Sequence, residues 1–298
     1  MQISVLMPIY NTNHDELRVA IESILNQTFT DFEFIIINDG STNGVEDVIL
    51  SYKDERIKYY KNETNMKIIA TLNRGLELAQ GKYIARLDGD DYNTPDRLEK
   101  QFNHMEAHPE VGVLGTFFTR VPTNAKIELP YTQKDAKICM RYVRGCILHS
   151  SAMIRKSVLD EHDLKYDIAC LHAEDHKLWS DMSRFCEIEV LPEFLTYHRV
   201  SPEGISQQNA IWQQKMVCLI FMENIIRDFA ADKNYMYNIL RKYVTDTPIS
   251  MKEFLSIKSL FEQVCVHLSN EISEPHKEMV PNFIMRMLTG FLITKDFK

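Results

Sequence analysis

The stretch Lys82-Tyr83-Ile84-Ala85-Arg86-Leu87-Asp88-Gly89-Asp90-Asp91 decides the fold and points to the chemistry of this chain. Residues 82–87 predict a buried strand, and three carboxylates follow it within four residues. Carboxylates so close together repel one another unless a cation lies between them, and Gly89 leaves room for a ligand at the backbone. Oxygen ligands favour Mg²⁺ or Mn²⁺, which can bridge to phosphate oxygens. The tetrapeptide 88–91 therefore predicts a divalent cation site at the end of a strand.

Strands and helices alternate on both sides of this stretch. We expect strands over Ile3–Ile9, Phe34–Asn38, Ile57–Tyr60 and Lys82–Leu87, and helices over Asp15–Gln27, Val45–Tyr52, Ile68–Ala79 and Pro95–His108, the last one capped by Thr94. This alternation predicts an α/β fold in which helices flank a mainly parallel sheet on both faces.

Polar residues follow three of these strands. The first strand runs into Pro8-Ile9-Tyr10-Asn11, the second into Asn38-Asp39-Gly40-Ser41, and the fourth into the acidic tetrapeptide. Ligands of parallel α/β sheets bind beyond the carboxyl ends of the strands. We therefore expect the three ends to form one site.

The second half of the chain has a different pattern. We expect strands over Ser151–Arg155, Ile188–Leu191 and Phe194–His198, and a helix over Glu174–Phe185 with Phe185 facing inward. After about residue 206 the pattern is helical almost throughout, so we expect a boundary near Gly204 and a helical extension behind it.

Several common sites are excluded or disfavoured by the sequence. The chain has no G-x-G-x-x-G, no G-x-x-x-x-G-K-[ST] and no G-x-S-x-G motif. An EF-hand loop over Asp88–Glu99 would need Gly at its sixth position, where Asn93 stands. A sugar-phosphate nucleotidyltransferase would need a Gly-rich basic loop where this chain has Tyr10-Asn11-Thr12-Asn13. A solvated acidic turn without a ligand remains an alternative reading of the tetrapeptide.

Composition and charge indicate which partners and which cellular compartment to expect. The 298 residues carry a net charge of −8 and no dense block of Lys and Arg, which disfavours nucleic acid. The six cysteines form no C-x-x-C pair and indicate reduced thiols in the cytoplasm. The first residues lack a basic secretory region, and the longest apolar run, Met216 to Met222, is too short to cross a bilayer.

Taken in order, the motifs resemble a known family. They are Val5–Asn11, Phe34–Thr42, Thr71–Gly75 followed by Gly81–Asp91, His149–Arg155, and Ala173–Asp175. Together they resemble the family-2 glycosyltransferases, which have the GT-A fold. The likeness covers about residues 1–206, so it implies a GT-A catalytic domain there, with a donor-binding half of about 1–118 and an acceptor half of about 119–206. Residues 207–298 would form the helical C-terminal extension.

The resemblance also implies roles for single residues. Pro8 and Tyr10 would flank the nucleotide base, Asp39 would bind the base or ribose, Arg74 would reach the nucleotide, Asp88 would contact the ribose and the metal, Asp90 would bind the metal, and Asp175 would be the general base with Glu174 beside it. One base opposite a metal-held leaving group implies direct displacement, and hence inversion at the anomeric carbon.

Two departures from the family pattern bear on the site and on the product. Relatives often carry a His where this chain has Ser201, so either His198 takes its place as the candidate third metal ligand or the third protein contact to the metal is missing. Processive relatives carry Q-x-x-R-W, but here the run Gln208–Trp212 has Ile211 in place of Arg. We therefore expect transfer of one sugar at a time.

The expected activity follows from these points. It is transfer of a hexose from a nucleoside-diphosphate sugar, with UDP the expected carrier and Mn²⁺ or Mg²⁺ as cofactor, to a saccharide or lipid-linked acceptor in polysaccharide biosynthesis. The alternative is a non-catalytic nucleotide-sugar-binding or scaffold protein of a polysaccharide assembly complex. We expect self-association, if any, through the C-terminal helices, and at most peripheral contact with the inner face of the membrane.

Overall fold

The computed structural model describes residues 1–143, 145–201, 208–244, 247, 249–274 and 276–282. The strands are β1 Ile3–Ile9, β2 Phe32–Asn38, β3 Ile57–Lys61, β4 Tyr83–Arg86, β5 Tyr92–Asn93, β6 Val111–Val121, β7 Ala125–Ile127, β8 Met153–Arg155 and β9 Glu187–Arg199. The helices are α1 His14–Leu25, α2 Val45–Leu50, α3 Ile68–Leu78, α4 Arg97–Ala107, α5 Gln133–Tyr142, α6 Lys156–Glu161, α7 Glu174–Met182, α9 Ala210–Phe229, α10 Lys233–Val244 and α11 Met251–Glu271, with short 3-10 turns η1 His149–Ser151 and η2 Ile168–Cys170.

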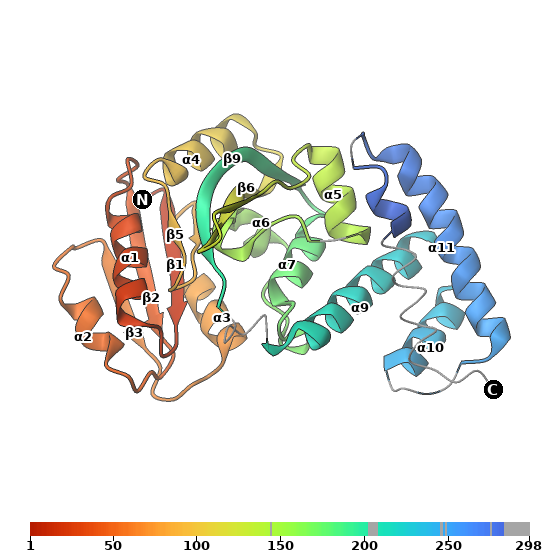
Figure 1. The fold of residues 1–298 in the computed structure, drawn as a ribbon, viewed down its shortest axis with the longest axis horizontal. Coiled ribbons are helices and arrows are strands. Elements are labelled where there is room, and N and C mark those ends of the chain that lie inside the picture. The colour runs from red at the N-terminus through yellow and green to blue at the C-terminus, as the bar shows by residue number, and fades with distance from the viewer. Residues whose placement is uncertain (144, 202–207, 245–246, 248, 275, 283–298) are drawn as a thin grey trace.

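A single mixed sheet runs through the molecule in the order β3-β2-β1-β4-β8-β6-β9-β5 (Figure 1). The half made by β3, β2, β1 and β4 is parallel throughout, as the alternating pattern predicts. In the other half β8 pairs antiparallel with both β4 and β6, whereas β6 and β9 pair in parallel. The α/β class is confirmed, and the parallel arrangement holds for the N-terminal half.

Both faces of β1 are buried, which explains its continuous apolar sequence. On one face, Val5 and Met7 belong to the core that includes the buried stripe of α1. On the other face, Leu6 belongs to the core that includes Leu72 of α3. Asn13 caps α1 by accepting hydrogen bonds from two backbone amides of its first turn.

The helical extension packs on the catalytic domain through the second of these cores. Phe221, Met222 and Ile225 of α9 are buried in the same cluster as Trp179 of α7. In Figure 1 α9, α10 and α11 lie at the end of the molecule opposite α2 and β3. The helical character predicted after residue 206 is confirmed, while the predicted boundary at Gly204 lies outside the described residues.

Four local predictions were wrong or incomplete. β6 and α5 were not predicted, and the two strands expected over 188–198 are one strand, β9. Phe185 is 48% exposed and stacks on His162 instead of facing the core. The N-cap of α4 is Asp96, and Thr94 donates a hydrogen bond to the Asp96 side chain.

Candidate active site

The three polar strand ends lie side by side. Because β2, β1 and β4 are neighbours in the sheet, their carboxyl ends share one edge. The backbone amide of Asp39 donates to Ile9 O at 2.8 Å, and that of Leu87 donates to Leu6 O at 3.2 Å. The arrangement therefore brings Pro8, Asp39 and the acidic tetrapeptide to a single edge of the sheet.

Asp39 is held by the segment that follows β3. Its side chain is 4% exposed and accepts hydrogen bonds from Asn62 Nδ2 at 2.6 Å and from the Met66 amide at 2.8 Å. Arg74 of α3 donates to the side chain of the same Asn62 and to Lys61 O. Asp39 and Arg74, which sequence placed in the nucleotide site, thus meet through Asn62.

Pro8 and Tyr10 stand at the end of β1 in different environments. Pro8 is buried within the sheet, where it pairs with Ile37 of β2. Tyr10 is 50% exposed and lies just beyond the strand end. A half-exposed aromatic ring at this edge offers a flat face on which a base can stack.

Asp88 is fixed by a buried arginine and a serine. Arg86 is 1% exposed and forms an ion pair with the Asp88 carboxylate, and Ser150 Oγ donates to the other carboxylate oxygen at 2.8 Å. Burial alone would raise the pKa of Asp88, but the charge of Arg86 together with these hydrogen bonds holds it well below its ordinary value. Asp88 is therefore a constantly ionised carboxylate in a fixed orientation.

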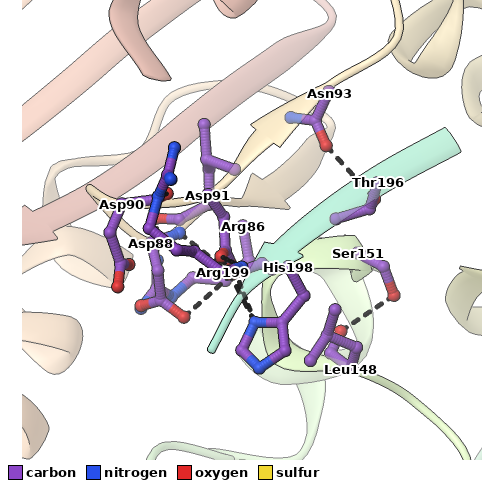
Figure 2. A network of polar contacts seen from close by, with 12 residues as sticks. Arg86, Asp88, Asp90, Asp91, Asn93, Leu148, Ser151, Thr196, His198 and Arg199 are labelled. Atoms are coloured by element: carbon purple, nitrogen blue, oxygen red, sulfur yellow. Dashed lines mark hydrogen bonds and ion pairs between the residues drawn. The ribbon is translucent and has the colours of Figure 1, made fainter. Parts of the chain in front are cut away.

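Asp91 holds the end of β9 against the same tip. Its buried carboxylate accepts a hydrogen bond from the Arg199 amide at 2.8 Å and lies 3.1 Å from His198 Nδ1 (Figure 2). Burial lowers the pKa of His198, but Asp91 outweighs that effect and raises it. A histidine whose Nδ1 faces a carboxylate presents Nε2 for a metal, so the contact is compatible with the expected ligand role.

Asp90 is the carboxylate of the tip that stays without a partner. No other side chain in the described part of the chain donates a hydrogen bond to it, and Figure 2 shows it beside Asp88 with no such bond drawn. Burial, followed by the charges of Asp91 and Asp88, raises the pKa of Asp90 to about 7. Because ionisation of Asp90 without a partner costs free energy, a bound cation would stabilise its ionised form.

The residues fit a cation that draws most of its ligands from the substrate. Among the described residues, no three Asp, Glu, His or Cys side chains meet as a ready-made metal site. Mg²⁺ is commonly bound by one or two carboxylates together with water and substrate phosphates. Asp90 supplies one such carboxylate, and Asp88 and His198 lie beside it.

Glu174 and Asp175 begin α7 on the acceptor side. Burial raises the pKa of Asp175 to about 6, with the charge of Asp88 adding to the effect. Burial and the neighbouring Asp175 raise the pKa of Glu174 to about 7, and Glu174 Oε2 is buried without a hydrogen-bond partner. Because the charge of Asp88 contributes to the raised pKa of both residues, Glu174 and Asp175 lie within electrostatic range of the acidic tip.

A hydrogen-bonded pair, His149 and Tyr166, lies near these carboxylates. His149 Nε2 lies 2.9 Å from Tyr166 Oη, and the Asn73 side chain bonds to both the amide and the carbonyl of Tyr166. Desolvation, with Arg86 adding to it, lowers the pKa of His149 to about 3, so this imidazole is neutral. The charges of Asp175, Glu174 and Asp88 all act on Tyr166, so this uncharged pair is near both groups of carboxylates.

Four residues of the site were missed by sequence reasoning. Arg86 and Ser150 were noted only within family motifs, and Asn62 and Arg199 were given no role in the site. Arg199 Nε donates to the Asp90 carbonyl at 3.1 Å and pairs with Glu16 at 3.2 Å. Only Arg86 carried a usable signal, because a charged residue inside an apolar strand is seldom buried without a partner.

Comparisons with known proteins point to one family. Residues 4–163 match the family model described as glycosyl transferase family 2. An uncharacterized glycosyltransferase of Methanocaldococcus jannaschii is 34% identical over 222 residues, which are 72% of this chain and 76% of the relative.

Solved structures agree in fold. The crystal structure of S. aureus TarS 1-349 in complex with UDP-GlcNAc has a TM-score of 0.65 at 17% identity, covering 99% of this chain and 90% of that one. The mannosyltransferase PcManGT from Pyrobaculum calidifontis, in complex with GDP-Man and Mn²⁺, has a TM-score of 0.57 at 13% identity, covering 99% and 88%.

Proposed function

Because this chain belongs to glycosyl transferase family 2 and is a glycosyltransferase with the GT-A fold, we propose that it moves one hexose at a time from a UDP-sugar to a saccharide or lipid-linked acceptor, with inversion and with Mg²⁺ or Mn²⁺ as cofactor. The observation that carries the proposal is Asp90, the carboxylate of the acidic tip that has no side-chain hydrogen bond and is available for a cation (Figure 2). Asp175, which lies within electrostatic range of Asp88, is the carboxylate available for a proton.

The donor lies along the edge formed by β2, β1 and β4 in this proposal. Tyr10 stacks on the base, Asp39 accepts hydrogen bonds from the base or ribose, and Arg74 approaches the nucleotide from α3. Asp88, which Arg86 holds ionised, accepts from the ribose hydroxyls. UDP as carrier is supported by the TarS complexes with UDP and UDP-GlcNAc.

The cation belongs beside Asp90, with Asp88 and His198 as its nearest further ligands. When bound, it stabilises the negative charge that develops on the diphosphate leaving group. The Mn²⁺ complex of PcManGT supports this choice of cofactor.

Asp175 performs the proton transfer. The acceptor hydroxyl oxygen forms a bond to the anomeric carbon while the bond from that carbon to the diphosphate oxygen breaks and its electron pair leaves with the diphosphate. The hydroxyl proton passes to the Asp175 carboxylate, which burial has made a stronger base than an exposed Asp. With a single base opposite the leaving group, the configuration inverts.

The deciding experiment measures nucleotide release from a panel of UDP- and GDP-sugars with and without Mn²⁺. We expect release from UDP-sugars that needs the metal and is lost in Asp90→Ala. Metal-independent release, or equal release by Asp90→Ala, would contradict the assigned cation site. Absence of both binding and turnover across the panel would favour the scaffold role.

Partners and location are also proposed. No helix in the described part of the chain is long and apolar enough to cross a membrane. We propose a cytoplasmic enzyme that meets its acceptor in solution or at the inner face of the membrane, with any self-association through the helical extension.

A further inference from the structure

A second cavity lies at the junction between the catalytic domain and the helical extension. It has a volume of about 810 Å³, which is within the range of small-ligand sites. Asp167, Ala169, Cys170 and Lys177 form one wall, and residues of α9 and α10 form the other. We call it the seam pocket.

The seam pocket shares a wall with the active site. Tyr166, whose hydroxyl pairs with His149 near the carboxylates, is followed directly by Asp167 of the pocket. On α7, the base Asp175 is two residues before Lys177, which lines the pocket. A ligand in the pocket therefore lies behind the segment that carries the base.

The floor of the pocket is apolar. Ile220 and Leu240 are 3% and 6% exposed, and Cys170 and Ile220 belong to a small apolar cluster with Ala173. The packing of α9 on η2 in this cluster closes the bottom of the pocket. Sugars present C–H faces that pack on such surfaces, as other amphipathic groups do.

The rim carries unused hydrogen-bonding groups. Asn234 and Asn238 are four residues apart on α10 and so lie on the same face, and Tyr237 lies beside them in the lining. Within the described part of the chain, the side chains of these three residues and of Glu223 form no hydrogen bond. Amide and phenol groups both donate and accept, which is the pairing that sugar hydroxyls require.

The charges of the lining favour a neutral ligand. Asp167 and Glu223 balance Lys177 and Arg241, and Lys177 is already paired with Asp181 at 2.6 Å. A phosphate or a nucleotide would find no unopposed positive charge here.

We propose that the seam pocket binds a neutral oligosaccharide, namely the part of the acceptor glycan remote from the hydroxyl that is glycosylated. This proposal rests on the proposed function, because it assigns a second subsite to the acceptor of that reaction. The proposal explains why an open, polar pocket lies between the helical extension and the segment that carries the base.

The test uses the full-length chain and neutral tri- and pentasaccharides of glucose, galactose, mannose and N-acetylglucosamine. Binding is followed by saturation-transfer NMR and calorimetry. Two variants change the pocket: Asn234→Ala with Asn238→Ala removes rim groups, and Ala169→Trp fills the space from an exposed lining position. Asn270→Ala, an exposed position on α11 outside the pocket, is the matched control.

We expect at least one oligosaccharide to bind the wild-type protein. Loss of two hydrogen bonds should weaken its Kd roughly 25-fold in the double variant, Ala169→Trp should abolish binding, and the control should be unchanged. Failure of every oligosaccharide to bind, or equal binding to both pocket variants, overturns the proposal.

A parallel titration with UDP and Mn²⁺ separates the two proposals. UDP binding should be the same in wild type, pocket variants and control, because no residue assigned to the donor site lines the pocket. If the wild-type protein binds an oligosaccharide but neither binds UDP nor releases it from UDP-sugars, the proposed function fails, and with it the role of the pocket as an acceptor subsite, while the pocket remains an oligosaccharide-binding site.

Discussion

Replacing the base by its amide, Asp175→Asn, should make the protein both inactive and more stable. The variant cannot accept the hydroxyl proton, and loss of a general base costs about 10²- to 10⁴-fold in rate. The amide oxygen can still accept the hydrogen bond that Asp175 Oδ1 accepts from the His176 amide, so the start of α7 is preserved. The loss of activity should therefore not come from unfolding.

The stability gain follows from the raised pKa. Burial raises the pKa of Asp175 from its ordinary value of 3.8 to about 6, which corresponds to about 3 kcal/mol at pH 7. Asp175 is only half-buried, and solvent screening reduces this figure, so we expect a gain of about 1–2 kcal/mol. Because the folded state binds the proton more tightly than the unfolded chain, wild-type stability falls as pH rises from about 4 to 6. The gain should therefore nearly vanish at pH 4.

Urea denaturation at pH 7 and pH 4 measures the stability of both proteins, and initial rates from pH 5 to 8 measure kcat/KM. Wild-type kcat/KM should fall about tenfold per pH unit below pH 6, because the base becomes protonated. Asp181→Asn, a partly exposed residue of the same helix, is the control and should keep its activity. Activity of Asp175→Asn within tenfold of wild type would move the base to Glu174. A variant no more stable than wild type at pH 7 would refute the argument from burial.

Three further substitutions test the scaffold of the site. Arg86→Met removes the buried partner of Asp88. Because the Asp88 side chain is 39% exposed, we expect the free energy of unfolding to fall by about 2 kcal/mol rather than the 3–5 kcal/mol of a fully buried pair. We also expect at least a tenfold higher KM for the donor. Urea denaturation and donor kinetics measure both, and an unchanged KM would exclude Arg86 from positioning Asp88. In Gly81→Ala the new Cβ would lie 2.5 Å from Ser4 N on β1, so we expect a loss of about 3 kcal/mol, and an unaltered Tm would contradict that contact. Ser250→Ala removes the capping box of α11 and should cost about 1 kcal/mol in urea denaturation, whereas no change would mean that α11 adds nothing to cooperative unfolding.

The parallel half of the sheet could be predicted because its strands are buried on both faces. Such strands read as continuous apolar runs, and Ile3–Ile9 matches β1 at both ends. The polar residues that end these runs had to meet at one edge once the strands were parallel, so the placement of Asp39 and Asp88 followed from the pattern.

β6 could not be predicted because glycines interrupt it. Gly112 and Gly115 lower the strand propensity of the sequence, and glycine inside a strand often marks a close approach. The structure shows that approach: a Cβ at Gly112 would lie 2.2 Å from Cys186 Sγ, and one at Gly115 would lie 3.1 Å from Ile147. These neighbours are distant in sequence, so no local pattern contains the reason for the glycines.

Pro192 is the reason that β9 was predicted as two strands. A proline normally ends a strand, so the run was divided into two. In the structure, Thr116 of β6 pairs with Leu191 and Phe117 pairs with Phe194, so residues 192–193 form a bulge that accommodates the proline.

At the tip of β4, spacing alone locates the site, whereas the separate roles of its carboxylates were expected only from the family resemblance. In the structure, Asp88 and Asp91 differ from Asp90 because each of them has a partner, within the strand or far along the chain. Arg86 keeps Asp88 ionised, and the end of β9 occupies Asp91. Only Asp90 is left with a raised pKa and no side-chain partner, which makes it the carboxylate that gains most from a cation. In the proposed function, a chain with a net charge of −8 would bind an anionic diphosphate at its acidic tip, because a cation that stabilises Asp90 would also supply the positive charge that the donor needs.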